Sequence, residues 1–81
     1  MLLAEGYEDA FIGITIPQSS RDELAMYDFA ICIDIIMKRE NIKEEDAVDY
    51  FYFNVVNSFA GNYTPLFLKR ATLEQASKTH G

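Results

Sequence analysis

The segment from Ile42 to Phe67 constrains the fold most, because it has the pattern of an amphipathic helix, a glycine stop, a turn and a strand. Gly61 suits the left-handed backbone that ends many helices, and Thr64 before Pro65 is disfavoured in a helix. Residues that recur at spacings of three and four lie on one face of a helix. Here they are Ala47, Val48, Phe51, Tyr52, Val55, Ser58 and Phe59. We predict a helix before Gly61 and a strand after Pro65.

Two strands and another helix are predicted ahead of this segment. Ala10–Ile16 alternates as a strand does, and a polar loop, Gln18–Asp22, leads to a second short strand, Glu23–Tyr27. Asp28 is placed to cap a helix that runs to Glu40. The apolar face of that helix consists of Phe29, Cys32, Ile33, Ile36 and Met37. Asn41 suits the left-handed position after the helix.

The order of elements predicts a small α+β domain of the type β-β-α-α-β. An antiparallel helix hairpin would pack on one face of a three-stranded sheet completed by Leu66–Lys69. We expect the most apolar strand, Ala10–Ile16, to be central. The other face would be open, and an aromatic residue there would make it a second contact surface. The candidates for that position are Phe11, Tyr27 and Phe67.

The ends of the chain are expected to lie outside this core. Residues 1–70 are predicted to form a single domain that begins with a loose lead-in over residues 1–9. Residues 71–81 would be a C-terminal tail. Thr72 and Gln75 have the spacing of a capping box, so this tail either makes a short helix or frays.

Composition and charge exclude several classes of protein. Hydrophobic residues make up 49% of the 81-residue chain, which is enough for one modest core and excludes a disordered chain. The net charge of −6 gives no electrostatic reason to approach phosphate backbones or anionic membranes. We therefore expect neither direct nucleic-acid binding nor membrane binding, whereas a basic protein surface is a suitable partner.

Cysteine and histidine are too few for the usual catalytic and metal sites. Cys32 is the only cysteine, so no internal disulfide forms, and we expect a reducing, cytoplasmic location. Its place on an apolar helix face favours a buried inert thiol over a nucleophile. With His80 as the only histidine, a zinc site is effectively excluded. We predict no catalytic residue, no metal and no cofactor.

Acidic residues crowd the start of the second predicted helix, where carboxylates meet the positive end of the helix dipole. They are Glu44, Glu45, Asp46 and Asp49. Glu45 and Asp49 are four residues apart, so together they could bind a divalent cation or perform acid–base chemistry. A solvated first turn explains them equally well and is the favoured interpretation.

The far side of the same helix is a candidate surface for protein contact. Aromatic rings among acids and amides suit such contacts, and this side carries Asp46, Asp49, Tyr50, Phe53, Asn54 and Asn57. Glu44 and Glu45 extend the surface toward the helix start. The alternative is that Phe53 packs against the first strand or the tail and leaves Tyr50 partly exposed.

Ile31 and Ile35 lie opposite the apolar face of the first predicted helix. A helix that is apolar on both sides is usually buried on both sides. In so small a domain the second side would meet another subunit, so Ile31 and Ile35 are candidates for a homodimer seam.

The chain resembles a family of small, mostly uncharacterised proteins encoded by tailed bacteriophages. The match covers about residues 6–67, with departures at Asn41, Lys43, Asn57 and Ile31. The matching pieces are Phe11-Ile12-Gly13, Ala25-Met26-Tyr27-Asp28, Cys32 through Arg39, Glu45-Asp46-Ala47, Phe51, Phe53-Asn54, Gly61 and Thr64-Pro65-Leu66-Phe67. The resemblance implies a bacteriophage origin and a place in the cytoplasm of an infected bacterium. It implies no catalytic residues.

Together these features predict a small acidic phage accessory protein that binds and modulates a host protein. In its sharper form, the acidic faces imitate nucleic-acid charge and block a nucleic-acid-binding or defence factor. The first alternative is a homodimeric structural module without a host target. A remote alternative is a metal-binding protein or enzyme that uses the acidic cluster.

Overall fold

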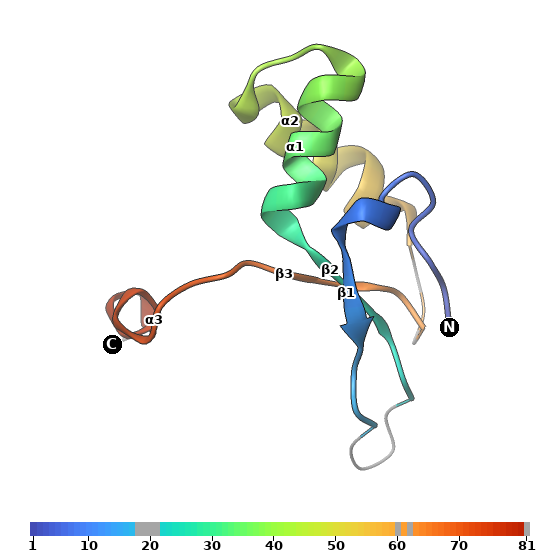
Figure 1. Ribbon diagram of the computed structural model, residues 1–81, viewed down its shortest axis with the longest axis vertical. Helices are drawn as coiled ribbons and strands as arrows, with labels where there is room; N and C mark the ends of the chain where they lie inside the picture. The colour runs from blue at the N-terminus through green and yellow to red at the C-terminus, as the bar shows by residue number, and fades with distance from the viewer. Residues whose placement is uncertain (18–21, 60, 62, 81) are drawn as a thin grey trace.

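The computed structural model describes residues 1–17, 22–59, 61 and 63–80 (Figure 1). It confirms the α+β class, with helices and a three-stranded mixed sheet. The polar loop predicted after the first strand falls mostly on residues 18–21, outside the described residues. In chain order the elements are η1 (Glu8–Ala10), β1 (Phe11–Ile14), β2 (Ala25–Asp28), α1 (Phe29–Glu40), α2 (Glu44–Tyr50), η2 (Phe51–Val55), η3 (Val56–Ser58), β3 (Leu66–Leu68) and α3 (Leu73–His80).

The central strand is β2, so the prediction that the strand Ala10–Ile16 would be central is wrong. β1 pairs with β2 in the antiparallel sense, and β3 pairs with the other edge of β2 in the parallel sense. The apolar content of β1 does not reflect burial, since Ile12 and Ile14 are exposed while Ala25 and Tyr27 of β2 are buried. What decides the order is the return of the chain through two helices, which brings β3 beside β2.

Of the three aromatic residues expected on an open sheet face, Tyr27 and Phe67 lie instead on the face that the helices cover, whereas Phe11 is 45% exposed at the edge strand. Phe11 pairs with Tyr27 and Tyr27 pairs with Phe67, and directly paired residues share one face of a sheet. The ring of Phe67 meets the ring of Phe51 in η2, with centroids 4.9 Å apart. The open face carries Met26, Leu66 and Leu68 instead.

The N-terminal segment belongs to the core, so the prediction of a loose lead-in is also wrong. Ala4, Tyr7 and Ala10 are buried. The backbone N–H of Ala4 donates to the hydroxyl of Tyr27 at 2.9 Å, and the N–H of Leu2 donates to the carbonyl of Tyr63. These bonds attach the segment to β2 and to the chain before β3, neither of which is near it in sequence.

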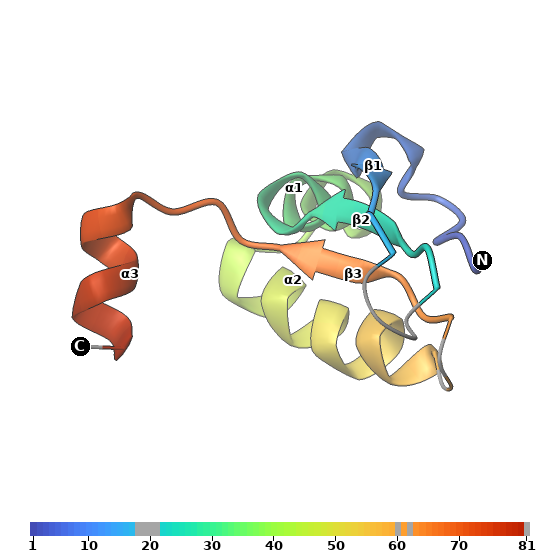
Figure 2. The same cartoon turned by 90° about the horizontal axis from the view of Figure 1, so that it is seen from below.

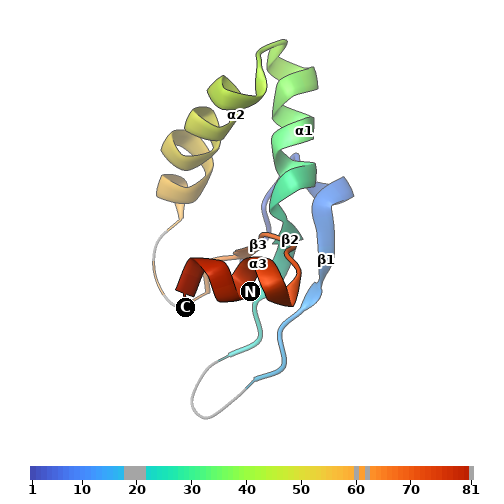
Figure 3. The ribbon, with the colours of Figure 1, turned by 90° about the vertical axis from the view of Figure 1, so that its left-hand side faces the viewer.

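The helix hairpin of α1 and α2 ends as the sequence predicts. Asp28 caps α1 by accepting from the N–H of Ile31 at 3.1 Å, and Asn41 takes the left-handed conformation with φ of 56°. After Ile42 and Lys43, α2 begins and lies beside α1 (Figure 3). The apolar face of α1 faces inward, with Cys32, Ile33 and Ile36 buried.

The second helix is not the single regular helix that the sequence predicts. It changes from α to a π turn over Phe51–Val55 and then to a 3-10 turn over Val56–Ser58. Ala47, Phe51 and Val55 are four residues apart, a spacing that drifts around a 3.6-residue α-helix. A π turn takes up an extra residue, so Phe51 and Val55 both stay buried. Tyr52 and Ser58, predicted on the buried face, are exposed.

The C-terminal helix α3 lies away from the rest of the molecule at the end of an extended segment (Figures 1 and 2). Its start is a capping box, because the N–H of Thr72 donates to Gln75 Oε1 and the N–H of Gln75 donates to Thr72 Oγ1. Leu73 is 85% exposed. The helix therefore forms without burying an apolar face on the domain.

Candidate functional site

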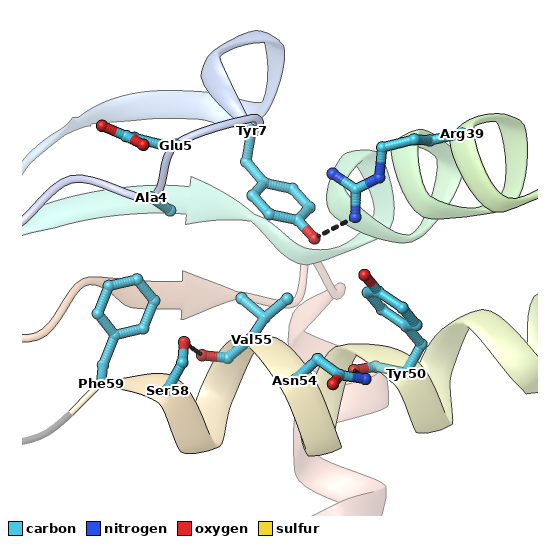
Figure 4. Close-up of a pocket in the computed structure, with 9 residues that line it drawn as sticks. All are labelled: Ala4, Glu5, Tyr7, Arg39, Tyr50, Asn54, Val55, Ser58 and Phe59. Atoms are coloured by element: carbon cyan, nitrogen blue, oxygen red, sulfur yellow. Dashed lines mark hydrogen bonds between the residues drawn. The ribbon is translucent and has the colours of Figure 1, made fainter.

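A polar hollow lies between the N-terminal segment, the last turn of α1 and η2 (Figure 4). Its volume is about 260 Å³. Arg39 and two tyrosine hydroxyls stand at one end, and apolar side chains stand toward the other. We call it the Arg39 pocket. Its lining consists of Ala4, Glu5, Tyr7, Arg39, Tyr50, Asn54, Val55, Ser58 and Phe59.

Arg39 is held beside two aromatic rings. The carbon at the centre of its guanidinium is 5.2 Å from the centroid of the Tyr7 ring and 5.8 Å from that of Tyr50. A cation at this distance is attracted by the electron-rich face of a ring. Its Nη2 donates to the Tyr7 hydroxyl at 2.9 Å, and its Nε donates to Glu40 at 3.1 Å. Packing and hydrogen bonds therefore fix the position of this guanidinium.

The same contacts favour the charged form of Arg39. The hydrogen bond to Tyr7 is the main cause that raises the pKa of the guanidinium above its ordinary value, and Glu40 and Tyr50 add to it against desolvation. Arg39 is thus a permanent cation on a chain whose net charge is −6. Its positive charge lies beside two carboxylates, that of Glu40, which accepts from its Nε, and that of Glu5 in the pocket lining.

Tyr50 and Asn54, predicted as protein-contact residues, line this pocket. The hydroxyl of Tyr50 points toward Arg39, and the Asn54 amide donates to the backbone carbonyl of Tyr50 at 3.2 Å (Figure 4). Tyr50 is half-buried, while Asn54 is exposed at the rim. The structure therefore separates these two residues from Phe53, which points elsewhere.

Phe53 is 78% exposed, so it packs against neither the first strand nor the tail. Glu45, Asp49, Phe53 and Asn57 follow one another at four-residue spacing, and all four are exposed. We call this row the outer ridge. Glu44 and Asp46 are exposed beside its start.

The acidic cluster is spread out in the structure. Within the described residues, no group of three or more aspartate, glutamate, histidine or cysteine side chains is arranged to hold a metal ion.

Cys32 is fully buried, as the sequence predicts, and desolvation, aided by Asp28, raises the pKa of its thiol to about 11. The reactive form of a cysteine is the thiolate, so this thiol is inert at neutral pH.

The two residues proposed for a dimer seam differ in exposure. Ile31 is 40% exposed, whereas Ile35 is half-buried and packs against the core. Of this pair, only Ile31 offers much free apolar surface.

Tyr7 and Arg39 were not singled out in the sequence. They are 32 residues apart, and only the fold of the N-terminal segment brings them together. The one local signal is the spacing of Ala4, Tyr7 and Ala10, which are three residues apart. The residues between them are Glu5, Gly6, Glu8 and Asp9. That spacing indicates a segment with one buried side.

The described residues contain no helix with the length and apolar character needed to cross a bilayer. In comparisons with protein-family models, curated proteins and solved structures, nothing matches this chain.

Proposed function

We propose that this chain is a small protein-binding accessory protein whose contact surface is the outer ridge. The observation that carries the proposal is the 78% exposure of Phe53 in the middle of an acidic helix surface. An aromatic ring buries a large area when a partner covers it, and such rings dominate the energy of many interfaces. In the isolated chain, the exposed ring of Phe53 contributes little burial energy to the fold.

The charges around Phe53 favour a basic partner. Asp49 is one turn before Phe53, and Glu45 is one turn before Asp49, so two carboxylates lie on the ridge on the N-terminal side of the ring. Together with Glu44 and Asp46, these carboxylates would attract a surface rich in lysine and arginine. Asn57 at the other end supplies amide donors and an acceptor.

The resemblance to tailed-bacteriophage proteins supports a bacterial host protein as the target, met in the cytoplasm. A nucleic-acid-binding or defence factor suits the ridge, because such a factor presents a basic surface that normally binds phosphates. Carboxylates on the ridge would occupy that surface in place of the nucleic acid, and Phe53 would supply apolar contact.

The homodimer alternative has a smaller basis in the structure. Ile31 offers free apolar surface on α1, but Ile35 already packs against the core of its own domain. A seam that contains a single exposed isoleucine buries less apolar area than a ridge that contains Phe53. We therefore place the contact on α2 and the turns that follow it.

The test is affinity capture of tagged protein from bacterial lysate with the wild type, Phe53→Ala and Ile16→Ala. Ile16 is 80% exposed, so its substitution removes a similarly uncovered apolar side chain away from the ridge. We expect one basic protein to be captured by the wild type and Ile16→Ala but at least about tenfold less by Phe53→Ala, since interface hot spots contribute 2 kcal/mol or more. Capture should also fall as salt is raised from about 0.1 M to about 1 M. Equal capture by all three proteins would contradict the proposal.

A further inference from the structure

The Arg39 pocket holds more hydrogen-bond donors than the fold uses. A guanidinium has five N–H donors, and two of those of Arg39 are used, by Glu40 and by Tyr7. The Tyr7 hydroxyl accepts from Arg39, so its own O–H is free to donate. Among the described residues, the Tyr50 hydroxyl has no hydrogen-bond partner, and it points to the same place (Figure 4). These donors converge on one end of the hollow.

The donors are fixed before any ligand arrives. Tyr7 is only 5% exposed, and the Arg39 side chain, 39% exposed, has its guanidinium against the rings of Tyr7 and Tyr50. Gly6 closes in from the N-terminal segment, where an added Cβ would lie 3.3 Å from Nη1 of Arg39. A group that is already ordered loses little conformational freedom on binding, so more of each contact appears as affinity.

The remaining N–H groups of Arg39 and the two tyrosine O–H groups can all donate to one oxyanion, and the neighbouring charges favour a single negative charge. Arg39 supplies one positive charge, Glu40 already accepts from its Nε, and Glu5 lines the rim. A second negative charge on the ligand would meet these carboxylates unpaired. A carboxylate also matches the planar guanidinium, which can donate to both of its oxygens.

The rest of the pocket favours an apolar ligand body. Ala4, Val55 and Phe59 line it beyond the donors, and Ser58 is occupied in donating to the Val55 carbonyl at 2.7 Å. The volume of about 260 Å³ suits a body no larger than a ring or a short branched chain.

We propose that the Arg39 pocket binds a small monocarboxylate, with Arg39 and both tyrosine hydroxyls on the carboxylate and with Val55 and Phe59 against the apolar body. This site goes beyond the outer ridge and does not depend on it. Phe53 lies outside the pocket, so the two proposals can fail separately.

The first test is a titration of the full chain with benzoate, followed by the backbone amide signals of Tyr7, Tyr50 and Asn54 in ¹H–¹⁵N spectra. We expect saturable shifts at concentrations up to about 10 mM, a range typical of a weak small-ligand site. Benzamide has the same ring without the charge, and inorganic phosphate has the charge without the ring. Binding of benzamide or phosphate as tight as that of benzoate would overturn the proposal, as would the absence of saturation by benzoate.

Substitutions then test which side chains donate to the bound carboxylate. Arg39→Gln should weaken benzoate binding at least about tenfold, the usual size of a lost hydrogen bond to a charged group. Lys38→Gln is the matched control, because Lys38 is the neighbouring cation on α1 and points to Asp34 on the surface. Equal weakening by both variants would show attraction by charge alone and would overturn the proposal.

Tyr50→Phe keeps the test decisive if Arg39→Gln disturbs the fold. It removes one hydroxyl that bonds to no described residue, so the fold should be unaffected while benzoate binding weakens about fivefold. Unchanged binding would remove Tyr50 from the site and overturn the proposed geometry.

The carboxylate could belong to a free acid or to the last residue of a peptide. The peptide Gly-Gly-Leu with a free C-terminus, compared with its amide, separates these sources. Tighter binding of the free peptide than of benzoate, with none by the amide, supports a peptide terminus. Binding of benzoate with none of the peptide supports a free acid.

Discussion

Asp28 shows how a single side chain holds several elements together. It is the last residue of β2, it caps α1 through the N–H of Ile31, and its other oxygen accepts from Nε of Arg70 after β3. The carboxylate is buried, whereas the Arg70 side chain is largely exposed. The pair therefore connects the start of the helix hairpin to the strand that follows it.

We predict that Asp28 makes the free energy of unfolding depend on pH in the acidic range. The Arg70 hydrogen bond, followed by the Ile31 N–H, lowers the pKa of this carboxyl below its ordinary value of 3.8. A lowered pKa in the folded state gives stability that is present above 3.8 and is lost as pH falls through the folded value. Asp28→Asn keeps a good cap but loses the charge. In urea unfolding, the wild type should be more stable than Asp28→Asn at pH 7, and this difference should shrink as the pH falls below 3.8.

Asp28→Ala serves as the control because it removes the cap as well. It should be less stable than Asp28→Asn by about 1 kcal/mol at every pH, since an alanine cannot accept from the first helical turn. A difference between wild type and Asp28→Asn that stays constant with pH would contradict a titrating Asp28.

At the scale of elements, α2 begins without a side-chain cap. Lys43 occupies the cap position with extended backbone, and it makes no side-chain hydrogen bond to the first turn. The first turn is stabilised instead by Glu44, Glu45 and Asp46 near the positive end of the helix dipole.

We predict that Lys43→Ser raises the free energy of unfolding by about 1 kcal/mol, because a serine hydroxyl can accept from the N–H groups of the first turn. Lys43→Ala is the matched control, since it removes the same charge without adding an acceptor. Both variants can be compared with the wild type in thermal and urea unfolding. Equal stability of the serine and alanine variants would show that the start of α2 is not limited by its cap.

The elements that depend on neighbouring residues were predictable from the sequence. Asp28 as a cap and Asn41 as a left-handed end act within one helical turn, so their residue types indicate their roles. The order of the sheet was not predictable in this way, because β3 joins β2 from a distant part of the chain. The π turn likewise reflects the packing of Phe51 and Val55 on the core rather than a local preference.

The same distinction between local and distant residues holds for the candidate functional surfaces. The outer ridge follows from helical spacing, so Phe53 and Asp49 could be named in advance. The Arg39 pocket could not, since Tyr7 and Arg39 are 32 residues apart and meet where the N-terminal segment folds against the domain. Tyr50 lies beside Asn54, as helical spacing predicts, but its ring is next to Arg39 of α1 and not on the ridge with Phe53.

At the scale of the whole molecule, α3 and its linker contribute little to the folded body. The helix stands apart in Figures 1 and 2, and the last strong contact before it is the pair of Arg70 with Asp28. The tail is thus attached at Arg70 rather than at the helix.

We predict that ending the chain at Ala71 leaves the free energy of unfolding within about 0.5 kcal/mol of the full chain, as for other surface changes. Arg70→Ala in the full chain should instead lower it by about 2 kcal/mol, because a buried carboxylate loses its charged partner. Urea unfolding of the three proteins checks both values. A large loss on truncation would mean that α3 packs on the domain in solution.

The parallel pairing of β3 with β2 also has a consequence for the order in which the chain folds. Met26 pairs with Leu66, so this contact closes a long loop, whereas β1 with β2 and α1 with α2 join neighbouring segments. Long loops are entropically unfavourable to close, so β3 should arrive last. Until it arrives, one edge of β2 and the ring of Phe51 are uncovered, and an unpaired edge can add a strand from another chain. A newly made molecule is therefore most prone to aggregate just before its last strand docks.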